Sequence, residues 1–290
     1  MTQVSPVESA TVEAPTVPHR VGSDRPFYIC FGVIGGFYVL LIVLMLAADA
    51  WRVVYDPNIA TWTSPHAVFA ALAAPEIQYA IWLSMISCTL TTIFSLWVAT
   101  PIGYLMSRHE FRGKVIVDAI LDIPIVLPPL VLGLSLLILF QFAPFRWISD
   151  YVVYEVPSVI LAQFMVACAF AVRTMRTTFD QISPRQEQVA LTLGCSQSQA
   201  FFAVVLPQAR RGAMTAATLA WARSLGEFGP ILIFAGSTRM RTEVLPTTVF
   251  LEIQAGNLTG ALAVSLLMVV AAVIVLVLAR LFGLRKAVVR

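Results

Sequence analysis

The chain has 290 residues, of which 59% are hydrophobic and only 12% are charged, and its mean hydropathy is +0.84. Soluble domains carry about 25% charged residues, so this composition indicates an integral membrane protein and excludes an ordinary soluble enzyme. The formal net charge of +3 is too small to favour a nucleic-acid partner. The four cysteines lack Cys-x-x-Cys spacing, and we expect small buried side chains rather than a metal site or a disulfide.

Six apolar runs are predicted to cross the membrane as helices, because about 20 apolar residues span the hydrocarbon core and a backbone in lipid must bond within its own segment. In chain order the runs are 27–48, 77–107, 123–145, 156–172 with a helical extension to about 179, 212–238 and 253–279. We therefore expect an all-α integral membrane fold with six transmembrane helices. Outside these helices we expect a disordered tail at 1–26, an external loop at 49–76 and a short tail at 283–290.

Basic residues are distributed unequally between the two sides that this topology defines. Fourteen lysines and arginines fall on the side of the two termini, and four fall on the opposite side. Because positively charged loops stay in the cytoplasm, both termini are predicted to be cytoplasmic. Trp51, Tyr55 and Trp62 follow the first run and suit the external interface of the membrane.

Three prolines interrupt the third run near its predicted cytoplasmic end, namely Pro124, Pro128 and Pro129. Gly133 follows them as a small residue suited to tight packing. A broken helix at membrane depth is tolerated only where it is packed in protein or lines a cavity. Pro128, Pro129 and Gly133 are therefore candidates for a path through the membrane or for its gate. A harmless kinked helix is the alternative.

The polar segment 184–207 lies between the fourth and fifth runs, on the predicted cytoplasmic side. Ser183 followed by Pro184, with Gln186 three residues after the cap, is typical of a helix start. An apolar face at helical spacing follows, which favours a short amphipathic helix.

A second helix is predicted after a turn in the same segment. Gly194 can take the left-handed conformation that ends a helix, and Ser196 with Gln199 repeats the cap pattern. Pro207 is expected to end the second helix. The segment is thus predicted to form helix, glycine turn and helix, and a plain linker is the alternative.

The fifth run contains two charges. Arg223 and Glu227 stand four residues apart, so they share one face of the helix. A charge at the centre of the membrane costs roughly 2.5–3.5 kcal/mol, and such residues usually face a bundle interior or a water-filled path. We interpret the pair, together with Phe228 and Gly229, as lining or gating a path. The alternative is a buried ion pair that only stabilises the fold.

Segment 187–207 resembles the cytoplasmic loop of the permease subunits of ATP-binding-cassette (ABC) importers. That loop reads EAA, three residues, Gly, nine residues, Ile, one residue, Leu-Pro. The matching positions here are Gln188, Val189, Ala190, Gly194, Val204, Leu206 and Pro207, with Glu187 just before the position where the family has its glutamate. In the family this loop is the coupling helix that sits in a groove of the ATPase subunit. The resemblance implies that these eight residues couple the chain to an ATPase.

Other segments resemble the molybdate, tungstate and sulfate branch of these permeases. They are RSLGEFGP at 223–230, LPPLVLGLSLL at 127–137, EVLPTTVFLEIQAGN at 243–257 and TPIGYLMSRHEFRGK at 100–114. The resemblance covers roughly residues 77–282. It implies a permease core with five of the six helices, a coupling loop at 184–207 and the fold of a type I ABC importer permease.

The resemblance also implies a function and a set of partners. The chain would be the permease of an ATP-driven importer of a tetrahedral oxyanion, molybdate or tungstate first and sulfate next, as a multi-pass protein of the inner membrane. Its partners would be a second copy of itself, two cytoplasmic ATPase subunits, an external solute-binding protein and membrane lipid. The sequence has no Walker motif, so we expect ATP–Mg to bind to the partner, and we expect no cofactor, metal or catalytic residue in this chain.

Three further interpretations are open from the sequence, and one of them, a structural membrane scaffold, would tolerate replacement of Gly194. The first is an ABC importer permease for another solute, such as phosphate, ferric iron or thiamine. The second is a channel or secondary transporter without an ATPase, which the sequence favours less because it has no obvious inverted repeat. A bound ATPase distinguishes the two, since only an importer needs one at 184–207.

Overall fold

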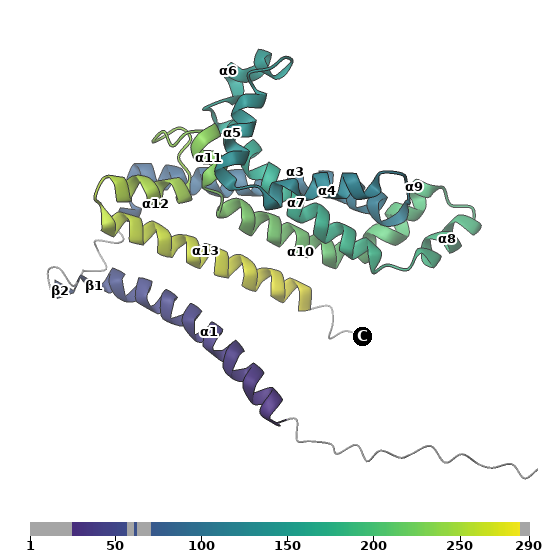
Figure 1. The fold of residues 1–290 in the computed structure, drawn as a ribbon, viewed down its shortest axis with the longest axis horizontal. Helices are drawn as coiled ribbons and strands as arrows, with labels where there is room; N and C mark the ends of the chain where they lie inside the picture. Colours follow the sequence, from purple (N-terminus) through teal and green to yellow (C-terminus); the bar gives the residue numbers. More distant parts are fainter. Residues whose placement is uncertain (1–24, 57–60, 63–70, 285–290) are drawn as a thin grey trace, which may run out of the picture. The chain divides into compact units, whose positions relative to one another are not determined.

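The computed structural model describes residues 25–56, 61–62 and 71–284, and helices dominate them (Figure 1). In chain order the elements are α1 (Arg25–Val54), β1 (Tyr55–Asp56), β2 (Thr61–Trp62), α3 (Pro75–Arg108), α4 (Lys114–Val126), α5 (Pro129–Leu139), η1 (Phe145–Ile148), α6 (Ser149–Val152), α7 (Val156–Asp180), α8 (Pro184–Thr192), α9 (Gln197–Ala200), η2 (Phe201–Val205), α10 (Leu206–Leu225), α11 (Gly229–Phe234), α12 (Leu245–Gln254) and α13 (Leu258–Leu284).

The chain divides into two compact units, Met1–Ala48 and Asp49–Arg290. Most of α1 belongs to the first unit, and it carries an uncharged apolar sequence from residue 27 to residue 48. The second unit contains all the other described elements. Its two short strands pair in antiparallel fashion, with Tyr55 opposite Trp62.

Helices α3, α7 and α10 form the centre of the second unit and pack against one another (Figure 1). Their contact surfaces are rich in small side chains that are completely buried. These include Ala99, Ala167, Ala171, Ala209, Ala216 and Ala220. Small residues at such positions let helix backbones approach closely, which is how helices associate in a membrane where no hydrophobic force drives them together.

Four helices in the described part of the chain are long and apolar enough to span a membrane. They are Phe27–Trp51, Pro75–Arg108, Val156–Asp180 and Leu258–Val277. α4 and α5 are long and apolar enough to span a membrane only when the two helices are taken together. The chain is thus a multi-pass helical membrane protein, and four of the predicted runs correspond to long helices. The predicted number of six crossings is not confirmed.

The third predicted run, 123–145, is two helices rather than one. α4 ends at Val126, and α5 begins at Pro129 at an angle of 112° to it. A residue that precedes proline avoids the helical region, and both Leu127 and Pro128 precede a proline. Their ψ angles are 138° and 132°, which is extended backbone. The two consecutive prolines therefore produce a sharp break inside the third run, at the place where the sequence predicts an interruption.

The fifth and sixth predicted runs also differ from the structure. α10 ends at Leu225 and a short break precedes α11, so run 212–238 is not one continuous helix. α10 does not qualify as a span by composition, because its arginines and threonines lower its hydropathy. Run 253–279 begins inside α12. That helix ends shortly before Gly256, whose φ is +77°. The long helix there is α13, which begins at Leu258.

Replacing Gly133 by alanine is expected to destabilise the protein. A Cβ atom at this position would lie 2.8 Å from the Cα of Pro230, a backbone atom on α11 that cannot rotate away. Overpacking of this kind costs about 1–3 kcal/mol. The measurement is the thermal unfolding midpoint of the purified chain in detergent. Gly226→Ala is the matched control, because its Cβ would meet its nearest atoms at 3.8 Å. Equal midpoints for the two variants would contradict the α5–α11 contact.

Candidate functional site

Two short helices, α8 and α9, form a hairpin at residues 184–200, hereafter the α8–α9 hairpin. Pro184 occupies the first turn of α8, as predicted, but the Ser183 side chain makes no capping hydrogen bond within the described structure. The second predicted cap is confirmed in full. The Ser196 hydroxyl accepts from the backbone N–H of Gln199 at 3.3 Å, and the Gln199 side chain accepts from the Ser196 N–H at 2.8 Å.

The predicted glycine turn joins the two helices. Gly194 has a φ of +91°, a conformation in which other L-residues are strained. Its N–H donates to the carbonyl of Leu191 at 3.0 Å, and the N–H of Cys195 donates to that of Ala190 at 3.1 Å. These two bonds are those of a Schellman motif, which satisfies the last carbonyls of a helix. The backbone of the hairpin therefore requires a residue that tolerates the left-handed conformation at position 194, which glycine does best.

The prediction that Pro207 ends the second helix is wrong. Helical structure continues through η2, a π-helical turn, into α10, and Pro207 lies in the first turn of α10. The N–H of Leu206 donates to the carbonyl of Phe201, five residues back, which widens the helix just before the proline. The Gln208 side chain then donates to the carbonyl of Val204 at 3.0 Å. A wider turn accommodates proline where an ideal α-helix would not.

Glu187 is the buried anchor of the α8–α9 hairpin, with only 5% of its surface exposed. Its Oε1 accepts from the hydroxyl of Tyr104 on α3 and, at 2.6 Å, from the side-chain amide of Gln197 on α9. Its Oε2 lies 3.3 Å from Nε of Arg108, whose Nη2 donates to the carbonyl of Ile182 at 2.9 Å. One carboxylate thus ties both helices of the hairpin to the end of α3.

The remaining residues of the loop motif divide between the interior and the surface. Ala190 is buried, whereas Val204 and Leu206 are half-buried. Gln188 and Pro207 are exposed. Three exposed apolar side chains accompany them on the outside of this region, namely Val189, Leu193 and Phe202. The hairpin therefore presents a mainly uncharged surface while its acidic residue points inward.

The two helix breaks lie against each other, although almost 100 residues separate them in the sequence. A Cβ on Gly229 would lie 2.8 Å from the Cβ of Pro129, and one on Gly133 would lie 2.8 Å from the Cα of Pro230. α5 and α11 therefore meet at backbone contact beside the α4–α5 break, next to Pro128. The structure brings these candidate path residues into one region.

The charged pair of the fifth run lies at the α10–α11 break. Nη2 of Arg223 is 2.7 Å from Oε1 of Glu227, and the Glu227 side chain is 1% exposed whereas that of Arg223 is 36% exposed. The guanidinium also lies 5.7 Å from the centre of the Phe170 ring on α7. Phe228, the next residue, stacks near Phe250 of α12 at 5.4 Å between ring centres. The pair adds no net charge to the break, so it suits a gate or a structural hinge better than an anion site.

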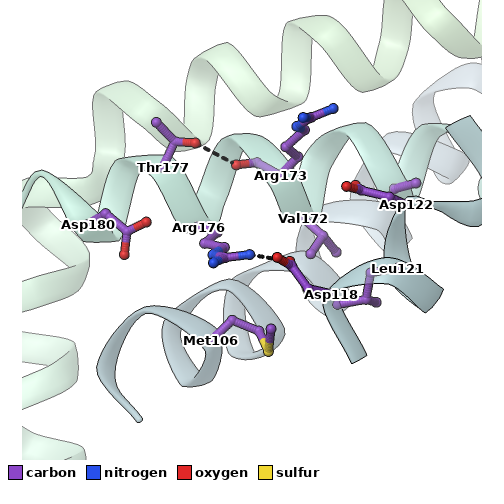
Figure 2. Close-up of a pocket in the computed structure, with 10 residues that line it drawn as sticks. Met106, Asp118, Leu121, Asp122, Val172, Arg173, Arg176, Thr177 and Asp180 are labelled. Carbon is purple, nitrogen blue, oxygen red and sulfur yellow. Dashed lines mark hydrogen bonds and ion pairs between the residues drawn. The ribbon is translucent and has the colours of Figure 1, made fainter. Parts of the chain in front are cut away.

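A second polar cluster lies between α4 and α7, around a cavity of about 250 Å³ (Figure 2). Arg176 reaches from α7 to Asp118 on α4, and the two form an ion pair. In the sequence, Asp118 and Asp122 stand just before the predicted run 123–145, and no local pattern indicates their partner. α4 begins nine residues before the predicted third run and therefore includes both aspartates. Its packing against α7 brings Asp118 to Arg176. Arg173 points away from this ion pair in Figure 2.

Sequence reasoning missed the anchor of the hairpin. Tyr104 and Arg108 are spaced four residues apart at the end of α3, which places them on one helix face. Nothing in that spacing indicates Glu187, because the partner lies 83 residues further along the chain from Tyr104. Only the packing of α7 against α3 brings the two segments together.

Comparisons with known proteins agree on one family. A family profile described as "Binding-protein-dependent transport system inner membrane component" matches residues 99–288. The chain is 32% identical over 214 residues to the molybdate/tungstate transport system permease protein of Pyrococcus abyssi, covering 74% of this chain and 79% of that protein. It is 27% identical over 246 residues to a sulfate transport system permease protein of Escherichia coli, covering 83% and 88% of the two chains.

The fold agrees with a solved transporter. A chain of a bacterial ABC transporter involved in the import of the acidic polysaccharide alginate superposes with a TM-score of 0.69. The match covers 90% of this chain and 96% of that one, at 16% sequence identity. This likeness shows a shared fold.

Replacing Glu187 by alanine is expected to loosen the α8–α9 hairpin without unfolding the bundle. The change leaves the Arg108 guanidinium and the Tyr104 hydroxyl without their shared acceptor, which costs about 1–3 kcal/mol. Amide hydrogen exchange of residues 184–200 in the full chain should therefore become roughly tenfold faster or more. Gln188→Ala, at the neighbouring exposed position, serves as the control. Unchanged exchange in the Glu187 variant would show that the carboxylate does not anchor the hairpin.

Proposed function

Because the chain belongs to the family of binding-protein-dependent transport system inner membrane components, we propose that it is the permease subunit of an ATP-driven importer of a tetrahedral oxyanion. Molybdate or tungstate is the first choice of substrate and sulfate the next. The substrate proposal is supported by relatives named as molybdate/tungstate and sulfate permeases. The coupling proposal is supported by one structural observation, the buried attachment of the α8–α9 hairpin to α3.

We propose six crossings of the inner membrane with both termini in the cytoplasm. α1, α3, α7 and α13 supply four of them. The bent pair α4–α5 supplies another, and α10 with α11 supplies the last. In this arrangement the breaks of the two interrupted crossings pack against each other, which satisfies the rule that irregular backbone at membrane depth must be covered by protein or line a cavity.

The α8–α9 hairpin is proposed to dock on a cytoplasmic ATPase subunit. Its exposed residues, including Gln188, Val189 and Leu193, would contact the partner. Its buried residues Glu187 and Ala190 hold it to the bundle. A displacement of the hairpin by the ATPase would then pull on the end of α3, since the Glu187 carboxylate bonds Tyr104 and pairs with Arg108 there.

Two copies of the chain, two ATPase subunits and an external solute-binding protein complete the proposed transporter. A two-fold pair would place a path between the copies, because a single bundle of this size has little room for one. ATP–Mg would be bound and hydrolysed by the partner subunits, and this chain would contribute no catalytic residue. The cytoplasmic and external partners are proposed from the family, whose name specifies dependence on a binding protein.

The α4–α5 and α10–α11 breaks are proposed to form the gate of the path. Gly229 and Gly133 let the two backbones touch, so α5 and α11 would move together. The ion pair between Arg223 and Glu227, with Nη2 and Oε1 2.7 Å apart, would hold the start of the α10–α11 break in place. A rearrangement of α10, transmitted from the hairpin at its other end, would therefore reach the gate.

The main test measures ATP hydrolysis by the permease reconstituted with its ATPase and its solute-binding protein. Stimulation by molybdate, tungstate or sulfate on the binding protein is expected, and Gly194→Val should abolish it. The residue needs a φ of +91°, and no described atom lies within 4 Å of its Cβ position, so valine acts only through backbone strain. Gly194→Asn is the control, because asparagine tolerates the left-handed conformation.

The outcomes of this test separate the proposals. If none of the three anions stimulates hydrolysis while the ATPase stays bound, the importer proposal stands and the oxyanion proposal is wrong. An ATPase that does not bind at all would contradict the importer. If the valine variant keeps the same stimulated ATP hydrolysis as the asparagine variant and the unchanged chain, the glycine turn is not needed for coupling.

Substitutions at the charged pair distinguish a gate from a structural ion pair. Arg223→Gln should destabilise the chain by about 1–3 kcal/mol, because the buried Glu227 carboxylate loses its partner, although the 36% exposure of Arg223 limits the loss. The double variant Arg223→Gln with Glu227→Gln should recover the thermal midpoint. If the pair is part of the gate, anion uptake by the double variant stays impaired. Recovery of both stability and uptake would assign the pair a structural role only.

A further inference from the structure

Gln163 is a polar side chain of α7 that lies inside the bundle, with only 1% of its surface exposed. On the same helix, Val159, Ala162 and Val166 around it belong to a buried apolar cluster. An amide that leaves water without gaining hydrogen-bond partners costs free energy, and a membrane bundle holds little water to supply them. The partners of the Gln163 amide therefore indicate what the residue does. Neither the loop motif nor the set of candidate gate residues includes it.

The Gln163 amide connects α7 to two neighbouring helices at one level of the bundle. Its Oε1 accepts from the hydroxyl of Thr91 on α3 at 3.3 Å. Its Nε2 donates to Sγ of Cys88, also on α3, at 3.7 Å and to the backbone carbonyl of Ser224 on α10 at 3.3 Å. All three partner residues are completely buried. Both hydrogens of the amide nitrogen are thus used, one toward each neighbouring helix.

The carbonyl of Ser224 lies where α10 stops. The helix ends at Leu225, and the last carbonyls of a helix have no partner further along it. The Ser224 carbonyl also accepts from the backbone N–H of Glu227 at 3.2 Å, and the Glu227 carboxylate pairs with Arg223. The first turn of the α10–α11 break is therefore held along the chain by the ion pair and across the bundle by Gln163.

The stability of the bundle depends little on this amide. Hydrogen bonds between helices in a membrane contribute only modestly on average. An apolar side chain at position 163 would also leave neither main partner without a bond. The Thr91 hydroxyl can still donate to the carbonyl of Ile160, which lies at 3.3 Å, and the Ser224 carbonyl keeps the N–H of Glu227. What the amide adds is a directional bond that fixes the end of α10.

We propose that Gln163 is a positioning residue for transport, which holds the end of α10 against α3 and α7 while the rest of the helix moves. The inference rests on the proposed function, in which a displacement of the α8–α9 hairpin travels along α10. With its far end fixed by the amide, α10 turns about this contact, and the α10–α11 break moves in step with the hairpin. Without the amide, the hairpin still docks and ATP is still hydrolysed, but the break no longer follows.

The first experiment measures anion uptake per ATP hydrolysed. The permease is reconstituted into vesicles with its ATPase and its solute-binding protein, and the anion is whichever of molybdate, tungstate and sulfate stimulates the unchanged transporter. Gln163→Met keeps the length of the side chain and removes its N–H donor. Hydrolysis should persist in this variant, while uptake per ATP falls roughly threefold or more, the change expected for one hydrogen bond between membrane helices.

Thr92→Val is the matched control for this experiment. Thr92 is also buried on α3, but its hydroxyl donates within its own helix, to the carbonyl of Cys88 at 2.7 Å. Uptake per ATP should be unchanged in this variant. A proportional loss of uptake and hydrolysis in Gln163→Met would overturn the proposal, because a merely structural role lowers both together. An equal fall of uptake per ATP in the control would also overturn it.

The second experiment needs no transport and uses the full-length permease alone in detergent. Amide hydrogen exchange of residues 224–228 should become roughly threefold faster in Gln163→Met, with the exchange of α3 unchanged. Unchanged exchange at 224–228, or faster exchange throughout the bundle, would overturn the proposal. Gln163→Leu removes the same donor with a different shape and should give the same results, so misfolding of one variant does not decide the outcome.

The two experiments separate this inference from the proposed function. If the unchanged transporter neither hydrolyses ATP in response to an anion nor imports one, the proposed function is wrong, and the role of Gln163 in transport is wrong with it. If the unchanged transporter works and only the Gln163 results differ from those expected, the proposed function stands and the inference is wrong.

Discussion

The close approach of α7 to its neighbours is the constraint on which the rest of the structure depends. Gly103 on α3 meets the backbone of α7 so closely that a Cβ would lie 2.9 Å from the Arg176 nitrogen, and a Cβ on Gly212 of α10 would lie 2.0 Å from Oγ1 of Thr178. Buried alanines make up much of the rest of these two contact surfaces. Larger side chains would push α3 and α10 outward. The ends of those helices would then no longer meet the segments that the proposed function requires.

Two regions that the proposed function uses follow from this packing. At one end, α3 places Tyr104 and Arg108 where they can hold the Glu187 carboxylate, so a hairpin of marginal length becomes part of the bundle. At the other end, α10 breaks at the Arg223–Glu227 pair, and α11 returns against α5 at backbone contact. α10 runs continuously from the hairpin to the α10–α11 break, because η2 joins it directly to α9. In the proposed function, this continuous helix would carry a displacement of the hairpin to the helix breaks.

Much of this arrangement was predictable from the sequence wherever one local signal determines the outcome. Uncharged runs predict α3 and α7, and the Ser196 cap and the Gly194 turn are specified within a few residues. Predictions failed where an outcome depends on competition with packing. The Pro207 ring would end an isolated helix, but a π-turn absorbs it here. The inward orientation of Glu187 depends on α3, which is distant in the sequence.

The inward orientation of Glu187 has a consequence for how the hairpin would recognise a partner. With its carboxylate buried inside the protein, the hairpin exposes uncharged polar side chains such as Gln188 and one charge, Arg185. The apolar contacts that it can offer a partner come from Val189 and Leu193. Contacts of this kind gain their free energy from the removal of apolar area from water, which dissolved ions barely screen, whereas exposed charge pairs weaken as ionic strength rises. Assembly through this surface should consequently tolerate high salt and weaken on cooling, the opposite of an interface held by ion pairs.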